Sequence, residues 1–206
     1  HFCTAERQYR TPLEYGGQRT PTAQWTVTGA GAAVLEKRQF PPYITHITTG
    51  KVIDFGVTDP NNMGGAMAPA AIDTLKAHFR DTKRSPKNYD LILTGDLGKV
   101  GREIVIDMMT AGGFDMEQNY NDTGCMIYDF ETQDVHAGGS GCGCVAVTLC
   151  GYVFEMMKKG ELNDVLILGT GALLSPTSSL QGESVPGIAH AISLSTTPGG
   201  GKNGLY

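Results

Sequence analysis

The residues best suited to chemistry lie in one short segment, residues 134–144, which reads DVHAGGSGCGC. It combines an aspartate, a histidine, a serine and two cysteines with four glycines, and an apolar run follows it. Glycines in such a turn let backbone N–H groups converge on an anion or oxyanion, and the start of a following helix adds partial positive charge. Close packing of a buried helix start, where only glycine fits, explains the same residues, so both interpretations stay open.

The candidate ligand site joins five residues of this segment to one earlier carboxylate. Its members are Asp96, His136, Gly138, Gly139, Ser140 and Cys142. Asp96 follows a short apolar run that predicts a buried strand, and α/β proteins bind ligands at the carboxyl ends of such strands. Capping of the next helix is the other role open to Asp96. His136 taken alone is typical of a hydrogen-bonded structural histidine, with a ligand role as the alternative.

The other polar motifs favour structural roles. The five cysteines, an odd number, lack the paired spacing of a zinc site. We therefore expect reduced thiols in a cytosolic compartment and no bound metal. His46 and His190 fall within predicted strands, which indicates core or sheet-edge positions. Residues 119–122 (NYND) predict an Asx turn, and a cation site built from oxygens is the alternative.

The segments between these motifs alternate between strand and helix patterns. Strands are predicted over residues 25–35, 43–57, 89–95, 164–170 and 187–194, and helices over 64–80, 100–109 and 142–158. Gly50 is a candidate bulge. The last helix is apolar on nearly every side, which predicts burial on several sides. The order predicts an α/β fold, with a mostly parallel sheet covered by helices on both faces.

Composition narrows the function classes. The 206 residues carry a net charge of −5, with 18% charged residues and 28 glycines. Scattered Lys and Arg on an acidic chain disfavour a nucleic-acid partner. No apolar run reaches the roughly 18–20 residues of a membrane span, and no signal peptide is recognisable.

Several motifs together resemble the stage V sporulation protein AD family of endospore-forming bacteria. The similarity extends over about residues 1–194 and includes the segment 134–144. The other strings that carry it are TAERQ (4–8), EYGGQ (14–18), PTAQWTVTGAG (21–31), NNMG (61–64), TGDLGKVG (94–101), GTGALLSPTS (169–178) and QGESVPGIAH (181–190).

This resemblance implies the thiolase fold, in which two similar halves form a layered α/β/α/β/α sandwich. Residues 1–39 would be the end of the first half, residues 43–194 the complete second half, and residues 195–206 a disordered tail. The opening third of the family's chain would be absent. The apolar inner face would then need that missing segment or a second copy of the chain, as in a homodimer, to cover it.

The resemblance further implies a non-catalytic protein that binds dipicolinic acid, alone or with Ca²⁺, during its uptake into the developing spore. The expected partners are membrane proteins of the same sporulation operon, and the expected location is peripheral to the spore inner membrane. No other cofactor is expected.

A loss of catalysis is expected because the catalytic pattern of thiolases and ketoacyl synthases is incomplete in this sequence. Their nucleophilic cysteine belongs to the first half, where this chain has none, and Cys3 lies downstream of that place. Where they have an imidazole, this chain has Asp96, and His136 matches the second position only with a shift. We therefore expect no catalytic residues. The alternatives are a divergent acyltransferase of that type and an interaction scaffold.

Overall fold

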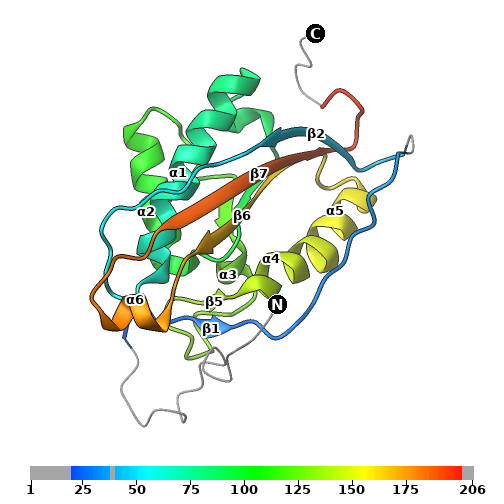
Figure 1. The fold of residues 1–206 in the computed structure, drawn as a ribbon. Helices are drawn as coiled ribbons and strands as arrows, with labels where there is room; N and C mark the ends of the chain where they lie inside the picture. Colours follow the sequence, from blue (N-terminus) through cyan, green and yellow to red (C-terminus); the bar gives the residue numbers. More distant parts are fainter. Residues whose placement is uncertain (1–19, 38–39, 201–206) are drawn as a thin grey trace.

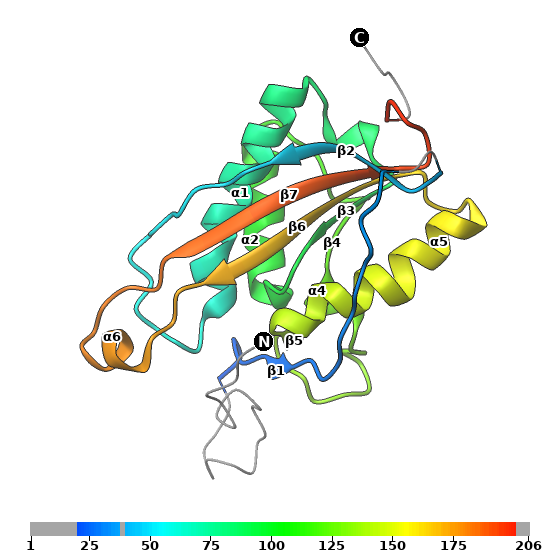
Figure 2. The same cartoon turned by 45° about the vertical axis from the view of Figure 1, so that its right-hand side comes forward.

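A computed structural model describes residues 20–37 and 40–200 and shows one five-stranded sheet between two groups of helices (Figures 1 and 2). The strand order is β2 (Tyr43–Thr48), β7 (Gly187–Ser195), β6 (Asp164–Ala172), β3 (Leu91–Thr94) and β4 (Tyr120–Asp122). The α/β prediction is therefore confirmed. Cys3, the strings at 4–8 and 14–18, and the last six residues of the expected tail lie outside the described residues.

Helices cover both faces of this sheet. One face carries α1 (Met63–Thr82) and α2 (Gly98–Ala111). The other face carries one continuous helical run, which consists of α4 (Cys142–Thr148), a π-helical turn (Leu149–Val153) and α5 (Phe154–Lys159). The short elements are β1 (Trp25–Thr26), a 3₁₀ turn (Pro86–Asn88), α3 (Thr123–Met126), β5 (Gly139–Ser140) and α6 (Pro176–Leu180).

Strand alternation divides the core between the two faces. In β6, Leu166 and Leu168 are fully buried and pack with the apolar side of α1 and α2. Val165 and Ile167 point to the opposite face and pack with residues of the π-helical turn and α5. Because successive strand residues face opposite ways, a continuous apolar run such as DVLIL supplies both cores.

The sheet is less parallel than expected. β3 pairs in parallel with β4 and β6, but β7 runs antiparallel to both β6 and β2. Only residues 173–186, with the five-residue helix α6, connect β6 to β7. A parallel crossover usually runs through a helix that packs on the sheet, whereas this link contains only the short helix α6 and returns the chain beside the strand it has just left.

The predicted strand at 25–35 is wrong beyond Thr26. After β1 the chain runs in an extended, exposed path beside α4 and α5 (Figure 2). A Cβ at Gly29 would lie 2.6 Å from Val147 Cγ2, and one at Gly31 would collide with the Ala146 carbonyl. These glycines therefore let the chain pack closely against a helix. A sequence pattern typical of a strand does not show whether the segment pairs with a sheet or packs on a helix.

The predicted strand at 43–57 is shorter, and its irregularity lies elsewhere. β2 ends at Thr48, and the register shift falls between Ile44 and His46. Gly50 instead packs directly on the Ala189 carbonyl of β7, where a Cβ would collide. Ile53 then makes an isolated bridge to Gly187.

The predicted helices at 64–80, 100–109 and 142–158 are all present, but the last is covered on one side only. Its buried residues are Cys144, Thr148, Val153 and Met157. Within the described part of the chain, the sheet and the extended segment after β1 are its neighbours, so Val145, Val147 and Leu149 stay partly exposed.

Candidate functional site

The carboxyl ends of β3 and β4 meet the start of α4 at one end of the sheet, and the β1–β5 pair lies beside them (Figure 2). Asp96 follows β3 here and accepts two hydrogen bonds. Its Oδ2 accepts from the Gly141 N–H at 2.8 Å, and its Oδ1 accepts from the Thr170 hydroxyl at 2.7 Å. Asp96 thus joins the loop after β3 to β6 and to the glycine-rich turn, rather than capping α2.

A second carboxylate, Asp122 at the end of β4, caps α2 instead. Its two oxygens accept from the N–H groups of Leu97, Gly98 and Gly124 and from the Thr94 hydroxyl, at 2.6–2.9 Å. The side chain is fully buried. Burial raises the pKa of Asp122 to about 7, although these four donors favour the charged form. An anion cannot occupy this start of α2 because Asp122 already fills it.

Residues 119–122 therefore form neither of the predicted structures. Tyr120–Asp122 is strand β4, and Asn119 donates from Nδ2 to the carbonyls of Pro86 and Tyr89. Among the described residues, no cluster of three or more His, Cys, Asp or Glu side chains could hold a metal ion.

The glycine-rich turn owes its shape to two residues with positive φ, Gly138 at 92° and Gly141 at 104°. Between them, Gly139 and Ser140 form β5, which pairs in parallel with β1. The carbonyls of Gly138 and Ser140 accept from the backbone N–H groups of Trp25 and Val27, at 2.8 and 2.9 Å. The close-packing interpretation is confirmed, because a Cβ at Gly138, Gly139 or Gly143 would lie within 3 Å of a neighbouring atom, and the anion-binding interpretation stays a prediction.

Gln24 ties this turn to the loop after β3, a role that sequence reasoning missed. Its Nε2 donates to the carbonyl oxygens of Asp96, at 3.0 Å, and Gly139, at 2.8 Å. The side chain is almost fully buried. Nothing in the string PTAQWTV marks this glutamine, since its partners lie 72 and 115 residues away.

His136 lies at the outer side of the turn. Its Nδ1 lies 2.7 Å from the Thr20 carbonyl, and its Nε2 lies 3.2 Å from Asp134 Oδ1. Its own φ is positive, at 48°. The structure therefore brings Asp96 together with the turn 138–141, but His136 binds the segment before β1 and its neighbour Asp134.

The described thiols near the turn lack an imidazole partner. Cys144 is buried with its Sγ 3.2 Å from the Thr123 hydroxyl, and burial raises the pKa of its thiol to about 12. Burial likewise raises the pKa of Cys125 to about 12. Both groups stay protonated at neutral pH, and a thiol nucleophile acts as the thiolate.

All four described histidines are hydrogen-bonded to groups other than cysteine. His46 contacts Thr45, His78 contacts Thr48 and Tyr89, His136 contacts Thr20, and His190 accepts from the Gly50 N–H. His46 and His190 lie in β2 and β7, as expected. The described site thus offers carboxylate oxygens, backbone groups and the protonated thiols of Cys125 and Cys144.

Comparison with known proteins decides the family. The family model described as "Stage V sporulation protein AD (SpoVAD)" matches residues 1–195. This chain belongs to that family. A curated member, stage V sporulation protein AD of Bacillus subtilis (strain 168), is 50% identical over 192 residues, which are 93% of this chain and 56% of the relative. The chain thus spans little more than half the length of this stage V sporulation protein AD.

The solved structures that match this chain are less similar to it in sequence than the curated relative is. A crystal structure of 3-oxoacyl-[acyl-carrier-protein] synthase III from Aquifex aeolicus VF5 is 15% identical with a TM-score of 0.42, covering 76% of this chain and 54% of that one. A ketosynthase (ApeO) in complex with its chain length factor (ApeC), from Xenorhabdus doucetiae, is 9% identical with a TM-score of 0.37, covering 77% and 80%. Likeness at this level carries no argument about activity.

Proposed function

We propose that this chain contributes to sporulation as a non-catalytic binding protein for dipicolinic acid, alone or with Ca²⁺, during uptake into the developing spore. The observation that carries the proposal is the family match over residues 1–195, together with 50% identity to a curated member. The position of the glycine-rich turn at the carboxyl ends of β3 and β4 supports it, since α/β sheets bind ligands there.

The ligand is a flat dianion, and Asp96 has the same sign of charge. The Asp96 oxygens accept hydrogen bonds from Gly141 and Thr170, and a carboxylate oxygen can accept from more than one partner. Ca²⁺ takes six to eight oxygen ligands and accepts carboxylates readily. A Ca²⁺ ion between Asp96 and the ligand would turn the repulsion into attraction, with Ser140 and Cys142 at the same turn.

Isothermal calorimetry with dipicolinic acid, with and without Ca²⁺, tests the proposal. We expect saturable binding at micromolar ligand. Asp96→Asn should remove the Ca²⁺-dependent part of the affinity, whereas Asp129→Asn, at an exposed turn, should leave it unchanged. No heat at millimolar ligand in either condition would overturn the proposal.

The rival function is acyl transfer by a divergent thiolase-type enzyme. The neutral, buried thiols of Cys125 and Cys144 argue against it. We expect no release of coenzyme A from short acyl-CoA substrates above background. Turnover that survives replacement of Cys142 and Cys144 by Ala would establish an enzyme and contradict our proposal.

The location peripheral to the spore inner membrane, beside membrane proteins of the same operon, is part of the proposal. None of the helices in the described part of the chain is long and apolar enough to span a bilayer. Co-purification with detergent-extracted membrane proteins from sporulating cells is the test, and recovery of the protein without any of them would count against this part.

A further inference from the structure

Among the described residues, a buried arginine at the opposite end of the sheet has no ion-pair partner. Arg84 follows α1 and is only 9% exposed. Its Nη1 is fully buried, and no described residue is hydrogen-bonded to it. None of the ion pairs among the described residues includes it. Its guanidinium carbon lies 5.7 Å from the centroid of the Tyr89 ring, and Arg84 and the buried carboxylate of Asp164 shift the pKa of the Tyr89 hydroxyl in opposite directions.

An unpaired cation in such a position is costly. Removing a charge from water is unfavourable unless an opposite charge or several hydrogen bonds replace the lost hydration. An arginine also keeps its charge under all physiological conditions, so Arg84 cannot lower the cost by losing a proton. A missing anion is the simplest explanation of a buried guanidinium with an unused N–H group.

Two neutral histidines lie beside Arg84. His78 is fully buried, with Nδ1 2.8 Å from the Thr48 hydroxyl and Nε2 2.6 Å from the Tyr89 hydroxyl. The pKa of His78 is lowered to about 4, mainly by burial and in smaller part by the nearby His46 and Arg84. The His46 ring centroid lies 6.3 Å from that of His78. Burial and Arg84 also lower the pKa of His46.

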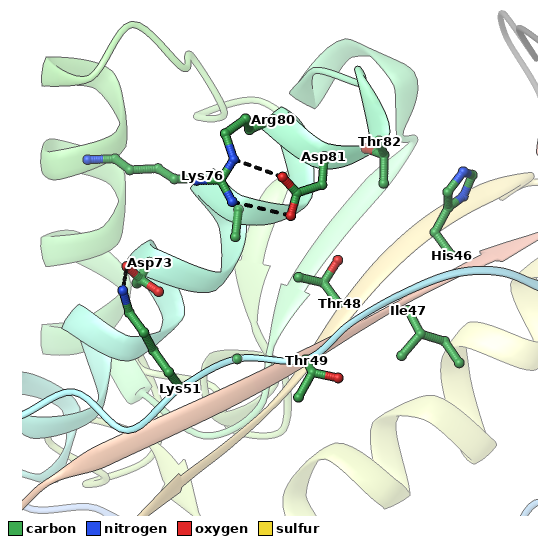
Figure 3. A pocket seen from close by; sticks show the side chains of 12 residues that line it. His46, Ile47, Thr48, Thr49, Lys51, Asp73, Lys76, Arg80, Asp81 and Thr82 are labelled. Carbon is green, nitrogen blue, oxygen red and sulfur yellow. Dashed lines mark hydrogen bonds and ion pairs between the residues drawn. The ribbon is translucent and has the colours of Figure 1, made fainter.

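His46 opens this cluster to solvent. It lines a groove of about 820 Å³ between β2 and the second half of α1 (Figure 3). Thr82, two residues before Arg84, also lines the groove. The groove holds the cations Lys51, Lys76 and Arg80 and the carboxylates of Asp73 and Asp81, which pair with Lys51 and Arg80.

Other groups close the far side of Arg84. Gly200, in the turn after β7, packs so closely that a Cβ there would collide with Nη2. Tyr89 covers the guanidinium on another side.

We propose that Arg84 and His46 form a binding site for a small oxyanion, a carboxylate or a phosphate, that enters from the groove between β2 and α1. The anion would take up the unused N–H of Arg84 and accept a hydrogen bond from His46. This site is separate from the turn at residues 138–141 and does not depend on the function proposed there.

Thermal unfolding of the full chain tests the proposal, with inorganic phosphate and malonate as separate probes and sodium chloride at matched ionic strength as the reference. We expect at least one probe to raise the Tm of the wild type by about 3 °C or more at saturation. Arg84→Met should abolish this rise. Arg80→Met, which removes an exposed arginine of the same helix, should retain it.

The same variants distinguish a binding site from a structural arginine. Without a probe, Arg84→Met should melt no lower than the wild type, because it removes an uncompensated buried charge while keeping a side chain of similar length. A wild-type Tm that is the same in phosphate, malonate and chloride would overturn the proposal. So would an anion response that Arg84→Met retains.

Nuclear magnetic resonance of the imidazole signals gives a second readout. A bound anion should raise the pKa of His46, because it offsets the charge of Arg84. The signals of His136, in the turn at the other end of the sheet, are the internal control. Equal shifts of both histidines would indicate a general salt effect and contradict the proposed site.

Discussion

Two carboxylates organise the loops at the carboxyl ends of β3 and β4, and they differ in how deeply they are buried. Asp122 is fully buried and accepts four hydrogen bonds, whereas Asp96 is partly exposed and accepts from Gly141 and Thr170. At the scale of residues, we therefore expect Asp122 to contribute more to stability than Asp96.

We expect Asp122→Asn to lower the free energy of unfolding by about 2–4 kcal/mol, because an amide has one acceptor oxygen and leaves buried N–H groups unpaired. Urea unfolding measures this. Asp129→Asn is the matched control, since Asp129 caps an exposed turn and should change stability by less than about 0.5 kcal/mol. Equal effects of the two substitutions would mean that the Asp122 hydrogen bonds contribute little.

The difference in free energy of unfolding between the wild type and Asp122→Asn should depend on pH, because Asp122 can bind a proton and the asparagine cannot. Its pKa is about 7 in the folded chain and 3.8 as the unperturbed value, so the folded state binds the extra proton between these limits. The stability from this group is present in full below pH 3.8 and is lost as the pH rises through 7. As the pH falls from 8 to 5.5, we expect the free energy of unfolding of the wild type to rise by roughly 2 kcal/mol relative to that of Asp122→Asn. A difference in stability between the two proteins that does not change with pH would show that the four donors keep the pKa of Asp122 low.

At the scale of elements, the two-stranded pair β1–β5 joins Trp25–Thr26 to the glycine-rich turn that precedes α4. Gly139 lies in β5 with ordinary backbone angles, and the positive φ values belong to Gly138 and Gly141. A Cβ at Gly139 would lie 2.8 Å from Val27 Cγ2 and 3.1 Å from the Tyr128 ring. Close packing, not backbone strain, is thus the reason for a glycine at this position.

Gly139→Val should therefore destabilise the chain by about 1–3 kcal/mol through overpacking. Gly169→Val is the control within a strand, because no atom lies within 4 Å of a Cβ at that position of β6. Valine favours strands, so we expect the control to be neutral or slightly stabilising. Circular dichroism melting curves of both variants check this, and an unchanged Tm for Gly139→Val would contradict the packing argument.

At the scale of the whole molecule, apolar side chains remain exposed around α4 and α5. A groove of about 590 Å³ lies between the extended segment after β1 and this helical run, and Leu35, Phe40, Leu149 and Phe154 are among its lining residues. Leu35 is 78% exposed and Phe40 is 56% exposed. Exposed apolar surface of this kind promotes association and dye binding.

We expect the 206-residue chain to bind a hydrophobic dye and to elute above its monomer size in size-exclusion chromatography. Leu35→Gln should reduce the dye fluorescence without lowering the Tm, because this side chain is largely in solvent already. Leu180→Gln, on α6 and 89% exposed, removes an equally apolar side chain outside the groove and should have little effect. A monomer that binds no dye would show that the groove is closed in solution.

The sequence by itself determined the elements whose patterns depend on near neighbours. The helix predicted at 64–80 follows from apolar periodicity, the buried strands predicted at 89–95 and 164–170 follow from short apolar runs, and the family follows from long motifs such as DVHAGGSGCGC. The sequence also grouped Asp96 with the glycine-rich turn, and the structure brings the two into hydrogen-bond contact, while ligand binding there stays a prediction.

Only the tertiary structure decided which residues meet across long sequence separations. In the fold, Gln24 and Asp122 hold the loops of the site together by hydrogen bonds, and His136 lies at the outer side of the turn. The glycines after β1 pack against a helix. The tertiary structure also left Arg84 buried beside two histidines, although arginine in a turn reads as a surface residue. The physical reason is that hydrogen bonds, burial and charge depend on three-dimensional neighbours, which periodicity and spacing along one chain do not specify.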